Sequence, residues 1–395
     1  MEERGMKKVF ALILTAAILL SLAACHQAAP QTETVCEPDG AMDTQISITD
    51  LAGQTHTFDK PVDKVIIQWT AGGGPFFTLA GLFGAEVTDH LVNLDDGLQV
   101  GRADMWEQFV KDLPALAELP DIGSMHKGSF DVEAAAASQA DAMILPLSLK
   151  TTVEDGDIDD KMMAAGIPIV YMDYHAETLE NHTKSITIMG QMFGKEERAQ
   201  EMVDFYTTHV KKVYDRVNEI LKTNQRPLVH MEVAWDSPAS SPSGFSNDYA
   251  WGKMVYDAGG TCTGEGVIQG EADLQPEYLL SVKPDKLILG GSYWPKNPES
   301  VRIGYQSTAE ETRKLVDGYI NGRAGWNEMP AVKNGDIYVV PHALARDVFD
   351  CACLEALAKD IWPEEFTELD PTATLQDFFA RFMPFTFGGT WFMKY

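Results

Sequence analysis

One stretch in the middle of the chain limits what the whole chain can fold into. From Lys195 to Lys222 the sequence contains no Gly and no Pro, and apolar residues recur every three or four positions. This spacing predicts an amphipathic helix of roughly 42 Å, at about 1.5 Å per residue. Gly190 and Gly194 predict a shorter helix before it and a break between the two. A helix this long either lies on one domain or joins two lobes. The sequence on either side of it shows which of these two arrangements to expect.

Strand and helix patterns alternate on both sides of this helix. Buried strands are predicted within residues 62–69, 140–146, 166–172, 226–235, 285–290 and 334–341. Residues 46–58 read as a hairpin, and residues 89–121 as an irregular, partly helical excursion. Such alternation is typical of parallel sheets covered by helices. We therefore predict an α/β fold of two Rossmann-like lobes with mainly parallel sheets: an N-terminal lobe over 46–175, a bridging helix over 176–225 and a C-terminal lobe over 226–395.

The first 45 residues differ from the rest. Arg4, Lys7 and Lys8 precede the short apolar run Val9–Leu20, and Leu22-Ala-Ala-Cys25 follows it. This order resembles a bacterial lipoprotein signal peptide, which would cover residues 1–25 and leave a lipid on Cys25. Residues 26–45 are polar and are predicted to form a flexible tether. The protein is therefore expected to be exported and anchored to the outer face of the cytoplasmic membrane.

Charge and cysteine content exclude several classes of function. The net charge of -28 argues against a nucleic acid partner, since phosphate binding needs a basic face. Beyond Cys25, the cysteines are too few for a disulfide scaffold and lack the pairing of a zinc site, so buried free thiols are expected: Cys36, Cys262, Cys351 and Cys353. The sequence contains no HExxH or GxSxG motif. No catalytic residue, metal site or cofactor is predicted.

Several stretches, taken in order, resemble one family. They are Ile48–Thr55, Ile122-Gly-Ser followed by Asp131-Val-Glu-Ala, Ala140–Leu145, Leu279–Asp285, and Trp326 with Pro330–Tyr338. They are similar to motifs of the helix-backbone (class III) substrate-binding proteins of ABC importers, which deliver ferric siderophores, haem or cobalamin. The resemblance implies a monomer that holds an iron chelate or related macrocycle between its lobes and docks on an ABC permease. One departure is that Pro75–Leu82 lacks the acidic residue that often contacts the permease in this family.

The loops after the predicted strands carry the candidate ligand-binding residues. Flat side chains suited to a macrocycle or catecholate stand there, although some could belong to the core: Trp69, Trp235, Phe245, Tyr293 and Trp294. Met125 or His126 could ligate haem iron axially, although most loop histidines only face solvent. His342 and Arg346 follow a strand end. Arg346 could bind an anionic chelate, or it could form a surface ion pair with Asp347 or Asp350.

These observations predict an extracytoplasmic binding protein that captures an iron chelate and does no bond chemistry. A corrinoid such as cobalamin is the alternative ligand for the same fold. Two further classes stay open on the residues alone. The first is a metal-dependent or chelatase-like enzyme assembled from dispersed His and Asp residues, and the second is a surface adhesin or scaffold.

Overall fold

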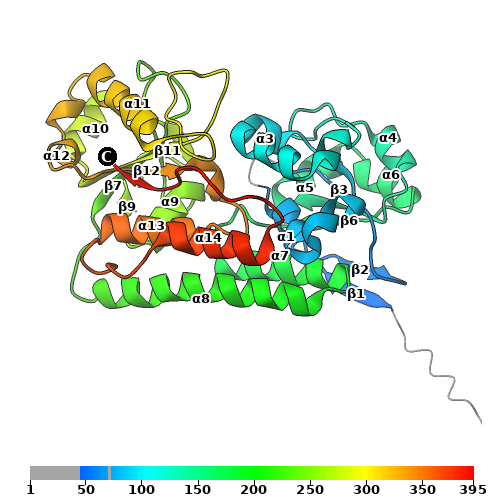
Figure 1. Ribbon diagram of the computed structural model, residues 1–395. Helices are drawn as coiled ribbons and strands as arrows, with labels where there is room; N and C mark the ends of the chain where they lie inside the picture. The colour runs from blue at the N-terminus through cyan, green and yellow to red at the C-terminus, as the bar shows by residue number, and fades with distance from the viewer. Residues whose placement is uncertain (1–44, 70–72) are drawn as a thin grey trace, which may run out of the picture. The chain divides into compact units, whose positions relative to one another are not determined.

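The structure, a computed structural model, describes residues 45–69 and 73–395 (Figure 1). The predicted signal peptide, its lipidated Cys25 and Cys36 lie outside the described residues. Within the described ranges, none of the helices combines the length and apolar character needed to cross a membrane. Cys262, Cys351 and Cys353 are buried free thiols, as the sequence predicts.

The N-terminal lobe is built on a four-stranded parallel sheet in the order β4-β3-β5-β6. Its strands are short and almost entirely buried: β3 (Val65–Ile67), β4 (Leu91–Leu94), β5 (Ala142–Pro146) and β6 (Ile169–Met172). The predicted hairpin precedes them as β1 (Ile46–Thr49) and β2 (Thr55–Phe58), which pair antiparallel. The Asp50 carboxylate joins this hairpin to the sheet, since it accepts hydrogen bonds from the Tyr171 amide at 3.0 Å and from His56 at 3.1 Å.

Helices flank the N-terminal sheet. They are α1 (Gly74–Phe83), α2 (Gly97–Gly101), α3 (Ala103–Asp112), α4 (Val132–Ala137), α5 (Lys150–Asp155) and α6 (Ile158–Ala164), with 3-10 turns at Gly84–His90, Pro114–Glu118 and Leu147–Leu149. Asp131 caps α4, as its sequence position predicts, because its side chain accepts a hydrogen bond from the Ala134 amide.

The C-terminal lobe contains a five-stranded sheet in the order β13-β12-β11-β7-β9, parallel except for β13. Its strands are β7 (Leu228–Val233), β9 (Thr261–Cys262), β11 (Lys286–Gly291), β12 (Ile337–Pro341) and β13 (Met393–Lys394). A small antiparallel ribbon is made by β8 (Ser243–Phe245) and β10 (Glu271–Asp273).

The C-terminal lobe carries six further helices among its described residues. They are α9 (Ala250–Asp257), α10 (Pro276–Val282), α11 (Ala309–Gly322), α12 (Pro330–Lys333), α13 (Cys351–Ile361) and α14 (Pro371–Phe382), with 3-10 turns at Trp326–Glu328 and His342–Leu344. In Figure 1, α13 and α14 run along the same side as the long helix α8.

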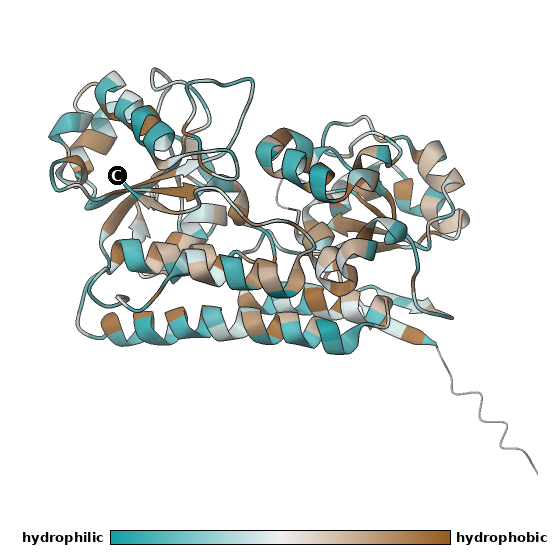
Figure 2. Cartoon of the chain, viewed as in Figure 1, coloured by the Kyte–Doolittle hydropathy of each residue, from teal (hydrophilic) through white to brown (hydrophobic). Residues whose placement is uncertain are grey.

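The central stretch forms two helices, as its glycines predict: α7 (Leu179–Met192) and α8 (Glu196–Ile220). Gly194 makes the turn with a φ of +61°, and a Cβ on Gly190 would lie 2.4 Å from that of Ala199. The buried residues of α8 recur every three or four positions, and Figure 2 shows the matching alternation of apolar and polar colour. Helix α8 contacts α1 of the N-terminal lobe and α13 of the C-terminal lobe, so it is a strut between the two.

The lobes also meet directly. Arg102 of the N-terminal lobe forms a buried ion pair with Asp347 at 2.8 Å. The Ser292 hydroxyl donates to the Gly101 carbonyl, and the Phe385 ring stacks on Phe109 with ring centroids 3.7 Å apart. These contacts restrain the lobes in addition to the strut.

The prediction misses several short strands. Strand β4 lies inside the stretch that we expected to be irregular, and no glycine or proline stands directly before it to mark its start. Strands β8, β9, β10 and β13 are two or three residues long. Segments this short carry no readable periodicity, because their pairing is decided by neighbours far away in the sequence.

Candidate functional site

A pocket of about 270 Å³ lies at the edge of the C-terminal sheet where its strands end. Val233 is the last residue of β7, Trp294 follows β11, and His342 and Arg346 follow β12. The carboxyl ends of parallel strands meet at one edge of a sheet, which is the usual place for a ligand in α/β folds.

The pocket brings together five of the nine candidate ligand-binding residues: Trp235, Phe245, Trp294, His342 and Arg346. Trp235 is 52% exposed, and Tyr249, which also lines the pocket, is 51% exposed. Large aromatic side chains are seldom this open, so their faces are available to a flat partner. Phe245 is buried and contributes to the wall.

Two neighbouring hollows share walls with this pocket. Trp235 also borders a polar hollow of about 480 Å³, which contains several serines and the ion-paired Glu232 and Arg323. Trp294 also borders a hollow of about 320 Å³ that reaches Gln99 and Val100 of the N-terminal lobe. The pocket therefore has room to extend in two directions from its aromatic walls.

Arg346 provides the positive charge of the pocket. Its Nε is buried without a hydrogen-bond partner, and no ion pair joins Arg346 to any residue that the structure describes. The surface ion pair that the sequence left open does not form, since Asp347 pairs with Arg102 and Asp350 with His182. The backbone of Arg346 has a φ of +72°, a left-handed conformation that is unfavourable for a long side chain.

His342 is a neutral hydrogen-bond donor at the back of the pocket. The Trp251 indole N–H donates to its Nδ1 at 3.0 Å, which places the ring proton on Nε2. Burial, followed by the charges of Arg346 and Arg102, lowers the pKa of His342 to about 3. The Trp294 ring lies beside it, with centroids 5.8 Å apart.

The candidates of the N-terminal lobe are split between core and surface. Trp69 is buried and stacks on His175 with ring centroids 5.5 Å apart. Met125 is buried in the core of this lobe, whereas its neighbour His126 is exposed. Desolvation and the charge on Arg346 lower the pKa of both His126 and His175. These two histidines therefore lie within the electrostatic reach of Arg346 although they belong to the other lobe.

Tyr293 does not line the pocket. It is partly buried, and the guanidinium of Arg302 lies 5.4 Å from its ring centroid. Sequence reasoning also missed residues that do line the pocket, namely Tyr249, Trp251 and Glu271. Tyr249 and Trp251 lie at the start of α9, and Glu271 reaches the pocket through the pairing of β10 with β8, which has no sequence signal.

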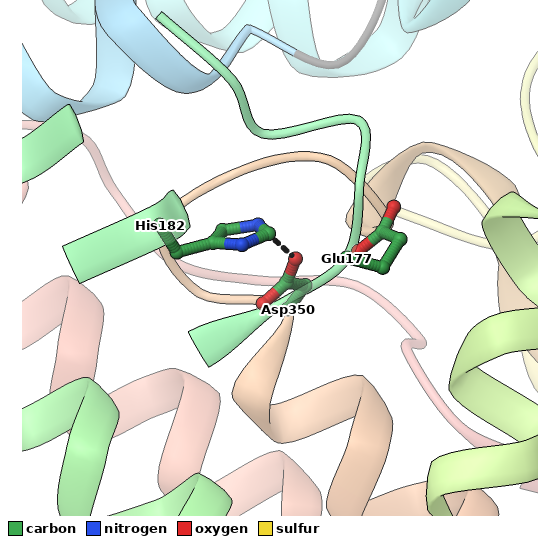
Figure 3. Close-up of side chains that lie close together, drawn as sticks. All are labelled: Glu177, His182 and Asp350. Atoms are coloured by element: carbon green, nitrogen blue, oxygen red, sulfur yellow. Dashed lines mark ion pairs between the residues drawn. The ribbon is translucent and has the colours of Figure 1, made fainter. Parts of the chain in front are cut away.

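A second polar group, which sequence reasoning also missed, lies in the interior (Figure 3). We call Glu177, His182 and Asp350 the buried cluster, since the side chains of all three are nearly inaccessible to solvent. His182 Nε2 lies 3.0 Å from Asp350 Oδ2. Burial raises the pKa of Glu177 well above its usual value, and repulsion from Asp350 adds to the effect. Burial alone would lower the pKa of His182, but the Asp350 carboxylate raises it.

Comparison with known proteins identifies the family. A family model described as "Periplasmic binding protein" matches residues 84–344. The chain belongs to this family. It is thus an extracytoplasmic substrate-binding protein of an ABC importer, of the helix-backbone class, and not an enzyme. No curated protein matches the chain significantly.

Solved structures agree with this assignment. The TroA-like periplasmic binding protein FepB from Veillonella parvula is 41% identical, with a TM-score of 0.85 over 88% of this chain and 99% of that chain. The molybdate-binding protein MolA from Haemophilus influenzae is 15% identical, with a TM-score of 0.61 over 87% and 99% of the two chains. A periplasmic heme binding protein from Pseudomonas aeruginosa is 15% identical, with a TM-score of 0.53 over 77% and 94%. The last two share the fold alone with this chain.

Proposed function

We propose that this protein captures an iron chelate, either a ferric siderophore or haem, and delivers it as a monomer to an ABC permease. The observation that carries the proposal is Arg346, which forms no ion pair with any described residue and lies in a pocket walled by exposed aromatic side chains. A guanidinium binds carboxylate and other anionic oxygens through paired hydrogen bonds. Tryptophan and tyrosine faces suit a macrocycle or a catecholate ring.

The backbone conformation of Arg346 supports a role in binding. A non-glycine residue at positive φ is strained by roughly 1–3 kcal/mol, and such residues persist mostly where function requires them. Glycine or asparagine would relieve the strain at Arg346, where φ is +72°. The side chain is therefore retained at some expense of stability, which is expected if it contacts the ligand.

The other polar groups narrow the ligand chemistry. His342 is neutral and offers one N–H, so Arg346 is the only base that directly lines the pocket among the described residues. A ligand with one or two anionic groups and a flat apolar part fits this set better than a highly charged anion. For the haem version of the proposal, the exposed His126 is the better candidate for an axial ligand, since Met125 is buried in the core.

We also propose that the mature chain is anchored through a lipid on Cys25, with residues 26–45 as a tether. The support is the order of basic, apolar and small residues before this cysteine. Cys25→Ser should release the protein from the membrane fraction without changing its ligand affinity. Retention of the variant in the membrane fraction would contradict the anchor.

Titration of the mature protein with ferric siderophores, haem and cobalamin tests the ligand. Trp235 and Trp294 line the pocket, so tryptophan fluorescence should be quenched by the true ligand and by no other. Mass spectrometry of the small molecule that copurifies provides an independent identification. Quenching by cobalamin alone would favour the corrinoid alternative, and quenching by none of them would refute the iron-chelate proposal.

If haem binds, the Soret band should shift in His126→Ala and stay unchanged in Met125→Ala. The second variant is the matched control, because it alters the neighbouring residue in the core. An unchanged band in both variants would remove this loop from the set of axial ligands.

A further inference from the structure

The buried cluster lies where three segments meet beneath the lobes. Glu177 belongs to the connection between β6 and α7, His182 to the first turn of α7, and Asp350 directly precedes α13. Their fractional exposures are 5%, 0% and 2%. One ligand-type atom from each side chain lies within 4.8 Å of those of the other two, and Figure 3 shows Asp350 between His182 and Glu177.

One polar atom of the buried cluster lacks a partner. Glu177 Oε1 is buried without a hydrogen bond, whereas His182 Nε2 and Asp350 Oδ2 face each other at 3.0 Å. A buried polar atom without a partner destabilises a fold by about 1–3 kcal/mol, so native proteins rarely retain one. Such an oxygen beside a second buried carboxylate and an imidazole indicates a positively charged partner shared by the three side chains.

The histidine is oriented as a metal ligand would be. Its Nδ1–H donates to the Thr178 carbonyl at 2.8 Å, which leaves Nε2 facing Asp350, 3.0 Å from Oδ2. Metal-binding histidines usually hold their second ring nitrogen in this way. The Tyr206 ring stacks on the His182 imidazole with ring centroids 5.2 Å apart, which further fixes its orientation.

We propose that Glu177, His182 and Asp350 hold one resident divalent ion of the first transition row, with Zn²⁺ or Mn²⁺ as the best candidates. One imidazole and two carboxylates suit these ions, whereas Ca²⁺ and Mg²⁺ prefer sites made of oxygen ligands only. The two carboxylates neutralise the ion, and the nearby Asp347 is already paired with Arg102.

The ion has a structural role. It joins the start of the α7–α8 strut to Asp350, which directly precedes α13, so it fixes the strut to the C-terminal lobe. Its ligands are buried and none of them lines the pocket around Arg346. The proposal is therefore independent of which cargo the protein carries.

Metal analysis of the purified protein after dialysis is the first test. We expect about one equivalent of zinc or manganese in the wild type and less than a tenth of that in Glu177→Gln and His182→Gln. The matched control is His209→Gln. His209 pairs with Glu355, also on α13, at 2.7 Å, and Thr374 occupies the second oxygen of Glu355, so no atom is left for an ion. Arg346→Asn should also retain the metal, since it alters only the cargo pocket.

A second measurement uses the wild-type protein, so the proposal can be tested even if the variants fold poorly. Wild-type protein is unfolded in denaturant that contains a chelator, which removes any bound metal. It is then refolded without metal and titrated with Zn²⁺, Mn²⁺ or Co²⁺. A saturating ion should raise Tm by about 5 °C, and bound Co²⁺ should give a visible absorption band that His182→Gln abolishes. Absence of stoichiometric metal together with an unchanged Tm would overturn the proposal. The two carboxyl groups of Glu177 and Asp350 would then be held together by a shared proton instead of an ion. Loss of metal in Arg346→Asn would overturn it too, because the ion would then belong to the cargo.

Discussion

The pocket around Arg346 and the buried cluster both receive a residue from the same short segment, but only the pocket is open to water. Arg346 contributes to the pocket, and Asp350 contributes to the cluster four residues later. Both regions contain polar atoms without partners. In the open pocket, water can satisfy such atoms until an exchangeable ligand replaces it. In the closed cluster water has no access, so only a permanent partner fits. Under our two proposals, unsatisfied polar atoms mark the place of the cargo in one region and of a resident ion in the other.

Asp347, which lies between the two regions, should give the largest effect. Its carboxylate neutralises the buried Arg102 at 2.8 Å and links the lobes. Asp347→Asn would remove the negative charge and should lower the free energy of unfolding by about 3–5 kcal/mol, measured by denaturant titration. The control is Glu311→Gln, which breaks the partly exposed pair with Arg302 and should cost less than about 1 kcal/mol. Equal effects of the two variants would show that burial of the pair contributes nothing.

Arg346→Asn should separate the pocket from the cluster. Asparagine removes the charge and tolerates the φ of +72°, so the fold should be at least as stable as in the wild type. The affinity for an anionic chelate should fall about 100-fold, which is the usual range for loss of a charged hydrogen bond in a pocket. Arg302→Asn, which removes a cation over Tyr293 outside the pocket, should leave affinity unchanged. Unaltered affinity in Arg346→Asn would exclude Arg346 as an anchor.

The pH dependence of stability tests whether His342 is neutral. Its folded-state pKa is about 3, below the ordinary value of 6.5, because of burial and the charges of Arg346 and Arg102. The unfolded state therefore binds more protons below pH 6.5, and stability is lost as the pH falls towards 3. Between pH 7.5 and pH 5, His342→Gln should lose about 1–2 kcal/mol less than the wild type. Glutamine can still accept the Trp251 indole hydrogen bond, so similar stabilities at pH 7.5 are the internal control. Parallel curves would mean that the pKa of His342 is the same in the folded and the unfolded protein.

The fold could be predicted from the sequence because its main elements are periodic. The α7–α8 pair follows from glycine positions and apolar spacing, and the long buried strands β7, β11 and β12 follow from their apolar runs. Strand β4 could not be predicted, since its four residues gain their conformation from pairing with β3. Such contacts between segments are invisible to local patterns.

The candidate site was only partly predictable for the same reason. The position of a residue after a strand indicates which edge it occupies, and this was enough for Trp235, Trp294, His342 and Arg346. The position after a strand does not indicate where the side chain points. Trp69 and Met125 also lie in loops that follow predicted strands, but their side chains are buried in the core. The buried cluster joins residues 177 and 350, whose proximity depends on the packing of both α7 and α13 against α8. The sequence contains no local signal for the buried cluster apart from the closeness of Glu177 and His182 along the chain.

Trp235 gives the smallest expected effect and the sharpest test of where cargo meets the pocket. Its ring is 52% exposed, so Trp235→Ala should not disturb the core and Tm should change by less than about 2 °C. Loss of one stacking face should weaken chelate binding about tenfold, or roughly 1.4 kcal/mol, measured by fluorescence of the remaining tryptophans. Tyr256→Ala is the control, because that ring is 39% exposed on the same lobe but lines a different hollow. Because Trp235 stands between the pocket and the polar hollow beside it, a large loss would place the ligand across both. An unchanged affinity would confine the ligand to the side of Trp294 and the N-terminal lobe.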